Sequence, residues 1–124
     1  MTVALAIPRP PAWLSPAGKR EWRRVAPILT NERRTLDPAD LAAFASYCAA
    51  VEQVEQASRE IAANGYTYKS KTKDGELIKA NPAVAIRDKA MTQVRLLAAE
   101  LGMTSASRAR AQTRSDGDDD GLFD

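Results

Sequence analysis

The fold is decided by residues 36–65, which read LDPADLAAFASYCAAVEQVEQASREIAANG. Asp37 is a good N-cap, and Pro38 suits the first helical position because its missing N–H would be unpaired there anyway. Apolar residues then recur at helical spacing as far as Ile61. Gly65 supplies the left-handed conformation in which helices commonly end. The segment therefore predicts one helix of about 26 residues, a rod of about 40 Å.

The sequence after this helix predicts a β-hairpin and then another long helix. Asp74-Gly75 separates two strand-like runs, and both residue types tolerate the positive φ of a type I′ turn. Asn81-Pro82 repeats the pattern of a cap followed by proline, and Gly102 marks the end of the helix that it starts. These two helices, joined by a short hairpin, should pack as an antiparallel pair.

The segments before residue 36 predict a shorter helix and an arm. Ser15 and Pro16 form a third cap-and-proline start, and Trp22 belongs to the apolar stripe that follows. Pro27 should kink or end this helix near its last turn. Residues 1–12 are rich in proline and lack periodicity, which is typical of an extended or disordered arm.

The predicted fold class is therefore mainly α. It is an antiparallel helical hairpin with a small β-hairpin between helices 2 and 3, plus a short N-terminal helix packed across it, and disordered termini. Thr104 can cap a short fourth helix over residues 105–110. We divide the chain into a flexible arm at 1–12, a helical domain at 13–110 and a flexible acidic tail at 111–124.

Composition excludes several classes of enzyme and of metal site. Histidine is absent, which excludes histidine triads and the commonest zinc sites. The single cysteine, Cys48, gives no disulfide framework and is interpreted as a small buried hydrophobe. No nucleotide-binding loop or serine-hydrolase motif occurs, and no apolar run reaches transmembrane length. We expect no catalytic residue, metal or cofactor, no membrane partner and a reducing cytoplasm.

Charge is segregated along the chain, although the net charge is only +2. Residues 1–36 carry seven basic and two acidic side chains, whereas residues 116–124 carry five acidic and no basic ones. Basic side chains that bind phosphates release counterions, so the basic clusters are candidates for DNA binding. The candidate DNA-binding residues are Lys19, Arg20, Arg23, Arg24, Arg33, Arg34, Lys69, Lys71, Lys73, Arg108 and Arg110.

Each basic cluster also has an interpretation without DNA. The cluster in the first helix can be a solvent-exposed face with Glu21 and Glu32 as local partners. Lysines at alternate positions from Lys69 to Lys73 share one strand face and can protect a sheet edge from aggregation. Arg108 and Arg110 can belong to a solvated segment.

The order of these segments resembles the small terminase subunits of long-tailed bacteriophages. The resemblance is carried by PAWLS at 11–15, EWRRVAP at 21–27, LDPADLA at 36–42, YC at 47–48, NPA at 81–83 and LAAELGMTSASRAR at 97–110. It implies a non-catalytic protein that binds double-stranded viral DNA near the packaging start in the host cell cytoplasm. It further implies a ring of roughly eight to ten subunits. The ring would regulate the large terminase subunit, which holds the ATPase and the nuclease.

The acidic C-terminus has two interpretations. It can be a solubilising tail, or a short motif whose apolar side chains anchor in a partner while its aspartates steer the approach. The resemblance makes the large terminase subunit that partner. The candidate partner-binding residues are Asp118, Asp119, Asp120, Leu122 and Phe123.

Two other functions remain open. One is a helical oligomeric scaffold without DNA binding. The other is a DNA-binding transcriptional regulator, but residues 30–36 form a longer connection than the three- to four-residue turn of a helix-turn-helix.

Overall fold

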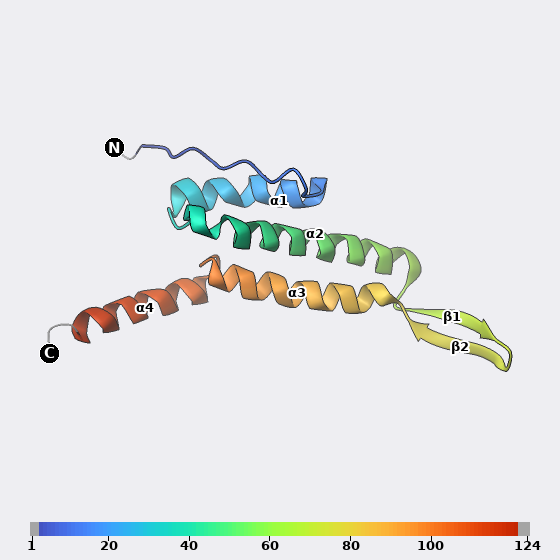
Figure 1. Cartoon of the computed structure of the whole chain (residues 1–124). Helices are drawn as coiled ribbons and strands as arrows, with labels where there is room; N and C mark the ends of the chain where they lie inside the picture. The colour runs from blue at the N-terminus through green and yellow to red at the C-terminus, as the bar shows by residue number, and fades with distance from the viewer. Residues whose placement is uncertain (1–2, 122–124) are drawn as a thin grey trace.

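Three helices lie side by side, with α2 between α1 and α3, while a β-hairpin and α4 extend from opposite ends (Figure 1). The structure is a computed structural model that describes the backbone of residues 3–121 and the side chains of residues 3–113. Its elements are α1 (Pro16–Pro27), η1 (Ile28–Glu32), η2 (Pro38–Asp40), α2 (Leu41–Asn64), β1 (Thr67–Thr72), β2 (Gly75–Ala80), α3 (Pro82–Glu100) and α4 (Ser105–Gly121). The prediction of a mainly helical fold with a hairpin between the second and third helices is confirmed.

Helix α1 begins and ends at prolines. Ser15 has the extended conformation of an N-cap and Pro16 is the first helical residue, as predicted. The Ser15 hydroxyl makes no capping bond, but its backbone N–H donates to Glu52 Oε2 of α2 at 3.1 Å. At Pro27 the α-helix ends and the chain continues as the π-helical turn η1.

The start of α2 uses a reciprocal cap. The Ala39 N–H donates to Asp37 Oδ1 at 2.9 Å, and the Asp37 N–H donates to Asp40 Oδ2 at 3.3 Å. The short 3₁₀ turn η2 lies between this cap and α2, which has 24 residues.

The start of α3 is capped by Asn81, as predicted. Asn81 Oδ1 accepts from the Ala83 N–H at 3.0 Å, and Asn81 Nδ2 donates to the Gly65 carbonyl at 2.9 Å. One side chain thus joins the end of α2 to the start of α3, with the hairpin between them.

The β-hairpin is confirmed, but its turn lies one residue earlier than predicted. Thr72 pairs with Gly75, so the turn is Lys73-Asp74. Gly75 takes a φ of 132°, whereas Asp74 is not among the residues with positive φ, so the turn is not type I′. Lys73 therefore lies in the turn and does not share the strand face of Lys69 and Lys71.

The main core lies between α1 and the first half of α2 and continues to the end of α3 on the other side of α2. Phe44 is fully buried, with its ring centroid 4.5 Å from that of Trp22 and 6.2 Å from that of Tyr47. The other buried members of this cluster are Leu14, Val25, Ala26, Leu29, Ala45, Cys48, Ala98 and Leu101. A smaller cluster near the hairpin contains Ala57, Ile61 and Ala83.

The residues that α3 buries most deeply are small ones. Ala83, Ala90 and Ala98 are buried, whereas Met91 and Ile86 are about half exposed, at 48% and 51%. Small side chains allow the backbones of α2 and α3 to approach closely, which leaves Ile86 and Met91 outside the contact, whereas Val94 and Leu97 pack against the core.

The N-terminal arm lacks regular structure, and several hydrogen bonds hold it along α1. Trp22 Nε1 donates to the Pro8 carbonyl at 2.8 Å. The Leu5 N–H donates to Asn31 Oδ1 at 2.7 Å, and Asn31 Nδ2 donates back to the Leu5 carbonyl at 3.3 Å. Val3, Leu5 and Ile7 remain exposed.

Helix α4 is longer than the short helix predicted over residues 105–110. Thr104 caps it as predicted, because Thr104 Oγ1 accepts from the Ser107 N–H at 3.1 Å. The helix continues to Gly121, and the Ala, Arg and Gln residues that favour a helix lie in its first part, up to residue 114. Leu122 and Phe123 lie outside the described residues, as do the side chains of residues 118–120.

Candidate nucleic-acid interface

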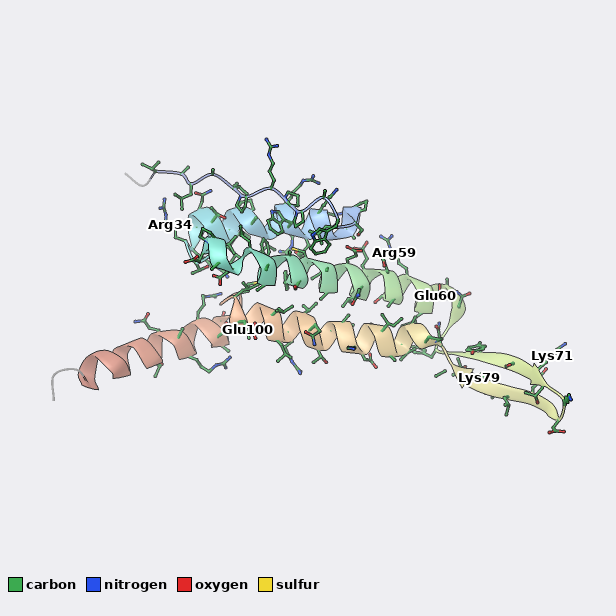
Figure 2. The ribbon with its side chains drawn as sticks, viewed as in Figure 1. Arg34, Arg59, Glu60, Lys71, Lys79 and Glu100 are labelled. Atoms are coloured by element: carbon green, nitrogen blue, oxygen red, sulfur yellow. The ribbon has the colours of Figure 1, made fainter. Side chains whose placement is uncertain are left out.

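The predicted DNA-binding residues fall into separate regions of the molecule. We call Lys19, Arg20, Arg23, Arg24, Arg33 and Arg34 the body cluster, and Lys69, Lys71 and Lys73 the hairpin cluster. Figure 2 labels Arg34 near the end of the helical layer where α4 leaves and Lys71 on the hairpin at the opposite end. The two clusters therefore cannot form one compact patch on a single subunit.

Two arginines of α1 have carboxylate partners. Arg24 Nη2 lies 2.5 Å from Glu21 Oε1, which confirms Glu21 as a local partner. Arg20 Nη1 lies 3.4 Å from Glu55 Oε1 of α2, a partner that local sequence does not indicate. Exposed ion pairs contribute only about 0–1 kcal/mol, so a phosphate can displace them.

Other basic residues of α1 are unpaired. Within residues 3–113, the side chains of Arg23 and Lys19 make no hydrogen bond or ion pair, and Glu32, the other predicted partner, has no ion pair either. Arg23 is exposed and Lys19 is partly buried. These two side chains leave charge available for a polyanion.

Arg33 and Arg34 connect distant parts of the backbone. Arg33 Nη1 donates to the Met103 carbonyl at 3.2 Å, and Arg34 donates to the Val3 carbonyl. Arg34 also has a φ of 53°, in the left-handed region that favours glycine. Both residues therefore have a structural role, whatever else they bind.

The hairpin cluster lies on a projection that is exposed at nearly every residue. Lys69 Nζ lies 4.0 Å from Glu76 Oε2, while Lys71 and Lys73 have no ion pair in the described part of the chain. The strand register also places Lys79 opposite Tyr68, on the other face from Lys69. Lys79 is a further exposed lysine of the hairpin and was not among the predicted DNA-binding residues.

The arginines of α4 differ in their surroundings. Arg108 Nη1 donates to the Met103 carbonyl at 2.9 Å, and Arg108 Nη2 donates to Ser105 Oγ at 3.2 Å. Arg110 is exposed and has no partner among residues 3–113. The fold thus brings Arg108 next to Arg33 of the body cluster, which their separation in sequence does not suggest.

Residues 18–118 match the family described as phage terminase, small subunit. The chain belongs to this family. The match runs from α1 into α4, so it includes the body and hairpin clusters and the arginines of α4. No curated protein and no solved structure matched the chain.

Small terminase subunits are generally non-catalytic and serve phage DNA packaging. The one cysteine thiol among the described residues of this subunit is inert in the folded state, since burial, helped by the negative charge of Glu21, raises the pKa of Cys48 to about 12. The described residues contain no cluster of three or more side chains able to hold a metal ion. None of the described helices is long and apolar enough to cross a membrane.

Proposed function

We propose that this terminase small subunit binds double-stranded viral DNA near the packaging start, assembles into a ring, and regulates the ATPase and nuclease of the large terminase subunit in the host cell cytoplasm. The observation that carries the proposal is the family match together with basic side chains exposed on α1, the hairpin and α4. The small subunit itself performs no catalysis in this scheme.

The proposed interaction with DNA is electrostatic, and its contacts are with the phosphate groups. Arg23, Lys71 and Arg110 are exposed and have no partner among residues 3–113, and the ion pairs of Arg20 and Arg24 are solvent-exposed. Phosphate contacts of this kind position a protein on DNA but do not read the base sequence. Repetition around a ring would multiply the weak attraction of each subunit.

Ring assembly is supported by apolar surface that stays exposed in a single subunit. Trp13 is 67% exposed, which is unusual for so large an apolar side chain. It borders a groove of about 230 Å³ between α2 and α3, lined otherwise by Ser46, Ala49, Ala50, Gln53, Gln93 and Leu97. A neighbouring subunit is the occupant that this groove fits in the proposed ring of roughly eight to ten copies.

The acidic C-terminus is proposed to bind the large subunit. Residues 116–124 carry five aspartates and no basic residue, so they would be repelled by DNA. In this proposal Leu122 and Phe123 anchor in the large subunit, while Asp118, Asp119 and Asp120 steer the approach.

The proposal is tested with purified large subunit and duplex DNA. Duplex affinity should fall steeply with salt concentration, and the full-length small subunit should stimulate the ATPase of the large one. Deleting residues 116–124 should abolish the stimulation and leave duplex binding intact. Absence of any salt-dependent duplex binding would reject DNA recognition, and equal stimulation by the truncated protein would reject the role of the tail.

An alternative is an oligomeric helical scaffold that does not bind DNA. It is favoured by one observation: Arg33, Arg34 and Arg108 are engaged with backbone carbonyls of the same chain. In that case the basic residues would hold the fold together, and a duplex titration would show no binding at any salt concentration.

A further inference from the structure

Two arginine side chains from distant parts of the sequence donate to the same backbone oxygen. Arg33 follows η1 and Arg108 lies in the first turn of α4. Their Nη1 atoms lie 3.2 Å and 2.9 Å from the carbonyl oxygen of Met103. Met103 belongs to the short connection between α3 and α4, so the two arginines meet at this junction.

The pair carries uncompensated positive charge. Within residues 3–113 the ion pairs involve other residues, and neither Arg33 nor Arg108 has a carboxylate partner. Because both Nη1 atoms donate to one oxygen, they lie no more than about 6 Å apart, and like charges at that distance repel. The carbonyl is neutral and its two lone pairs are both in use. An anion would relieve the repulsion.

Phosphate is the anion that suits this geometry. A guanidinium group presents five N–H donors in a planar fork that matches the oxygens of a phosphate. Arg33 uses only Nη1 in the described structure, so most of its donors are available. A third arginine, Arg24, which is paired with Glu21, lines a hollow beside Arg33 and Met103. The hollow there has a volume of about 170 Å³ and is lined by Arg24, Val25, Ile28, Leu29, Arg33 and Met103.

The junction is also the point from which α4 leaves the helical layer (Figure 1). Gly102 ends α3 with a φ of 67°, and the Met103 N–H donates to the Ala98 carbonyl at 2.8 Å. Arg33 is the side chain that ties this connection to η1, across 70 residues of sequence. Removing that bond would loosen the connection between α4 and the helical layer.

We propose that Arg33 and Arg108 form a binding site for a DNA phosphodiester, and that its occupation releases the junction between α3 and α4. The inference rests on the proposed DNA binding and adds a named site and a consequence. A phosphate carries a full negative charge and can accept two parallel N–H bonds from one guanidinium, whereas the neutral Met103 carbonyl accepts one bond from each arginine, so a phosphate competes well with it. Because α4 leads to the acidic C-terminus, DNA bound at the junction changes how that end is presented.

The test combines duplex affinity with hydrogen exchange in the full-length protein. Arg33→Ala and Arg108→Ala should each weaken binding to a short mixed-sequence duplex by about tenfold. The double variant should be little worse than either, because both side chains serve one site. Arg110→Ala is the matched control, since it removes one exposed charge from the same helix and should have a smaller effect.

Amide exchange over residues 103–113 reports the release. The duplex should speed exchange there in the unchanged protein. Arg33→Ala should exchange fast even without DNA and show no further increase. Inorganic phosphate should produce part of the increase, whereas chloride at equal ionic strength should not. Arg33→Lys keeps the charge but lacks the fork, so it should bind the duplex more weakly than the unchanged protein, and far-ultraviolet circular dichroism checks that each variant is folded.

The outcomes separate this inference from the function on which it rests. If the unchanged protein binds no duplex, the proposed function and this site both fall. If it binds, but Arg33→Ala and Arg108→Ala bind as Arg110→Ala does, the site is wrong while DNA binding stands. If affinity falls but the duplex leaves exchange over residues 103–113 unchanged, the release of α4 is overturned. If chloride increased the amide exchange as much as inorganic phosphate does, recognition of phosphate would be overturned.

Discussion

At the scale of single residues, Arg34 has the most unusual backbone. Apart from glycines, it is the one described residue with positive φ. It follows η1, and the next residue, Thr35, donates its N–H to the Leu29 carbonyl at 3.0 Å. In the left-handed backbone conformation, the Cβ atom of most residues lies too close to the following carbonyl oxygen. Glycine, which has no Cβ, is therefore the usual residue at such a helix end. Arg34 adopts this strained conformation, and its side chain donates a hydrogen bond to the Val3 carbonyl of the arm.

We expect Arg34→Gly to be more stable than Arg34→Ala by about 1 kcal/mol. Both variants lack the charge and the bond to Val3, so their difference isolates the backbone strain. Urea denaturation of the two variants measures this difference. Equal midpoints would mean that the turn relaxes to accommodate the alanine.

Cys48 should make stability depend on alkaline pH. Its pKa is raised by burial from the ordinary 9.0 to about 12, so the folded protein favours the neutral thiol. This contribution is fully present below pH 9 and is lost as the pH rises towards 12. Burial also raises the pKa of Tyr47 above its ordinary 10.0, so the range between pH 9 and pH 10 isolates the cysteine.

The measurement is the free energy of unfolding at a series of pH values. It should decrease from pH 9 to pH 10 in the unchanged protein and much less in Cys48→Ala. The thiol should also resist a soluble thiol reagent at pH 9 until the protein is unfolded. Rapid labelling of the folded protein, or identical pH slopes for the two proteins, would contradict the buried placement.

At the scale of elements, α1 and the hairpin compete as the main DNA-binding element. Changing Arg20, Arg23 and Arg24 together to alanine should weaken duplex binding, and the slope of log affinity against log salt should become shallower by about 0.9 for each phosphate that the variant no longer neutralises. Stability should change by no more than about 0.5 kcal/mol at Arg20 and Arg23, which are exposed, and by more at Arg24, because its partner Glu21 is only 10% exposed.

The matched control changes Lys69, Lys71 and Lys73 to alanine, which removes the same formal charge from the hairpin. If this variant binds the duplex weakly and the α1 variant retains its affinity, the hairpin is the DNA-binding element. Electrophoretic mobility or fluorescence anisotropy at several salt concentrations distinguishes the two cases.

The elements themselves were predictable wherever a local signal specifies them. Asp37-Pro38 and Asn81-Pro82 combine a capping side chain with a proline that fits only the first turn, so both helix starts were found from sequence. The hairpin was found, but its turn was misplaced by one residue. Asp74-Gly75 suits a type I′ turn, whereas in the structure the turn is Lys73-Asp74 and Gly75 takes its positive φ as the first residue of β2.

Interactions between elements were not predictable in the same way. Arg20 pairs with Glu55 and Arg33 reaches Met103, across 35 and 70 residues, and neither pair has a spacing that a periodic pattern reveals. Which apolar residues of α3 are buried also depends on a neighbouring element. Ala90 and Met91 are both apolar, and only the close approach of α2 decides that the smaller one is buried.

At the scale of the whole molecule, the chain has more surface than a compact monomer of its size. Its accessible surface is 8906 Å², whereas a compact monomer of 13.5 kDa would have about 6,500 Å². The excess arises because the hairpin and α4 project from opposite ends of a single layer of helices (Figure 1). In the proposed ring, other copies would cover part of this surface.

Trp13 should therefore lie at a principal interface between subunits. It borders the α2–α3 groove and also a hollow of about 470 Å³ against the arm, so its ring can seat in a neighbour from either side. Truncating a tryptophan at the centre of an interface typically costs at least about 2 kcal/mol of binding free energy. Trp13→Ala should lower the mass of the native assembly at micromolar concentration, while circular dichroism stays unchanged because the side chain is largely exposed.

Trp13→Phe keeps an aromatic ring and should retain most of the assembly. Ile86→Ala removes a half-exposed apolar side chain outside the residues that line the groove and should have little effect. Native mass spectrometry of the three variants tests this prediction. An intact assembly in Trp13→Ala would place the subunit interface elsewhere, and a monomer in the unchanged protein would contradict the proposed ring.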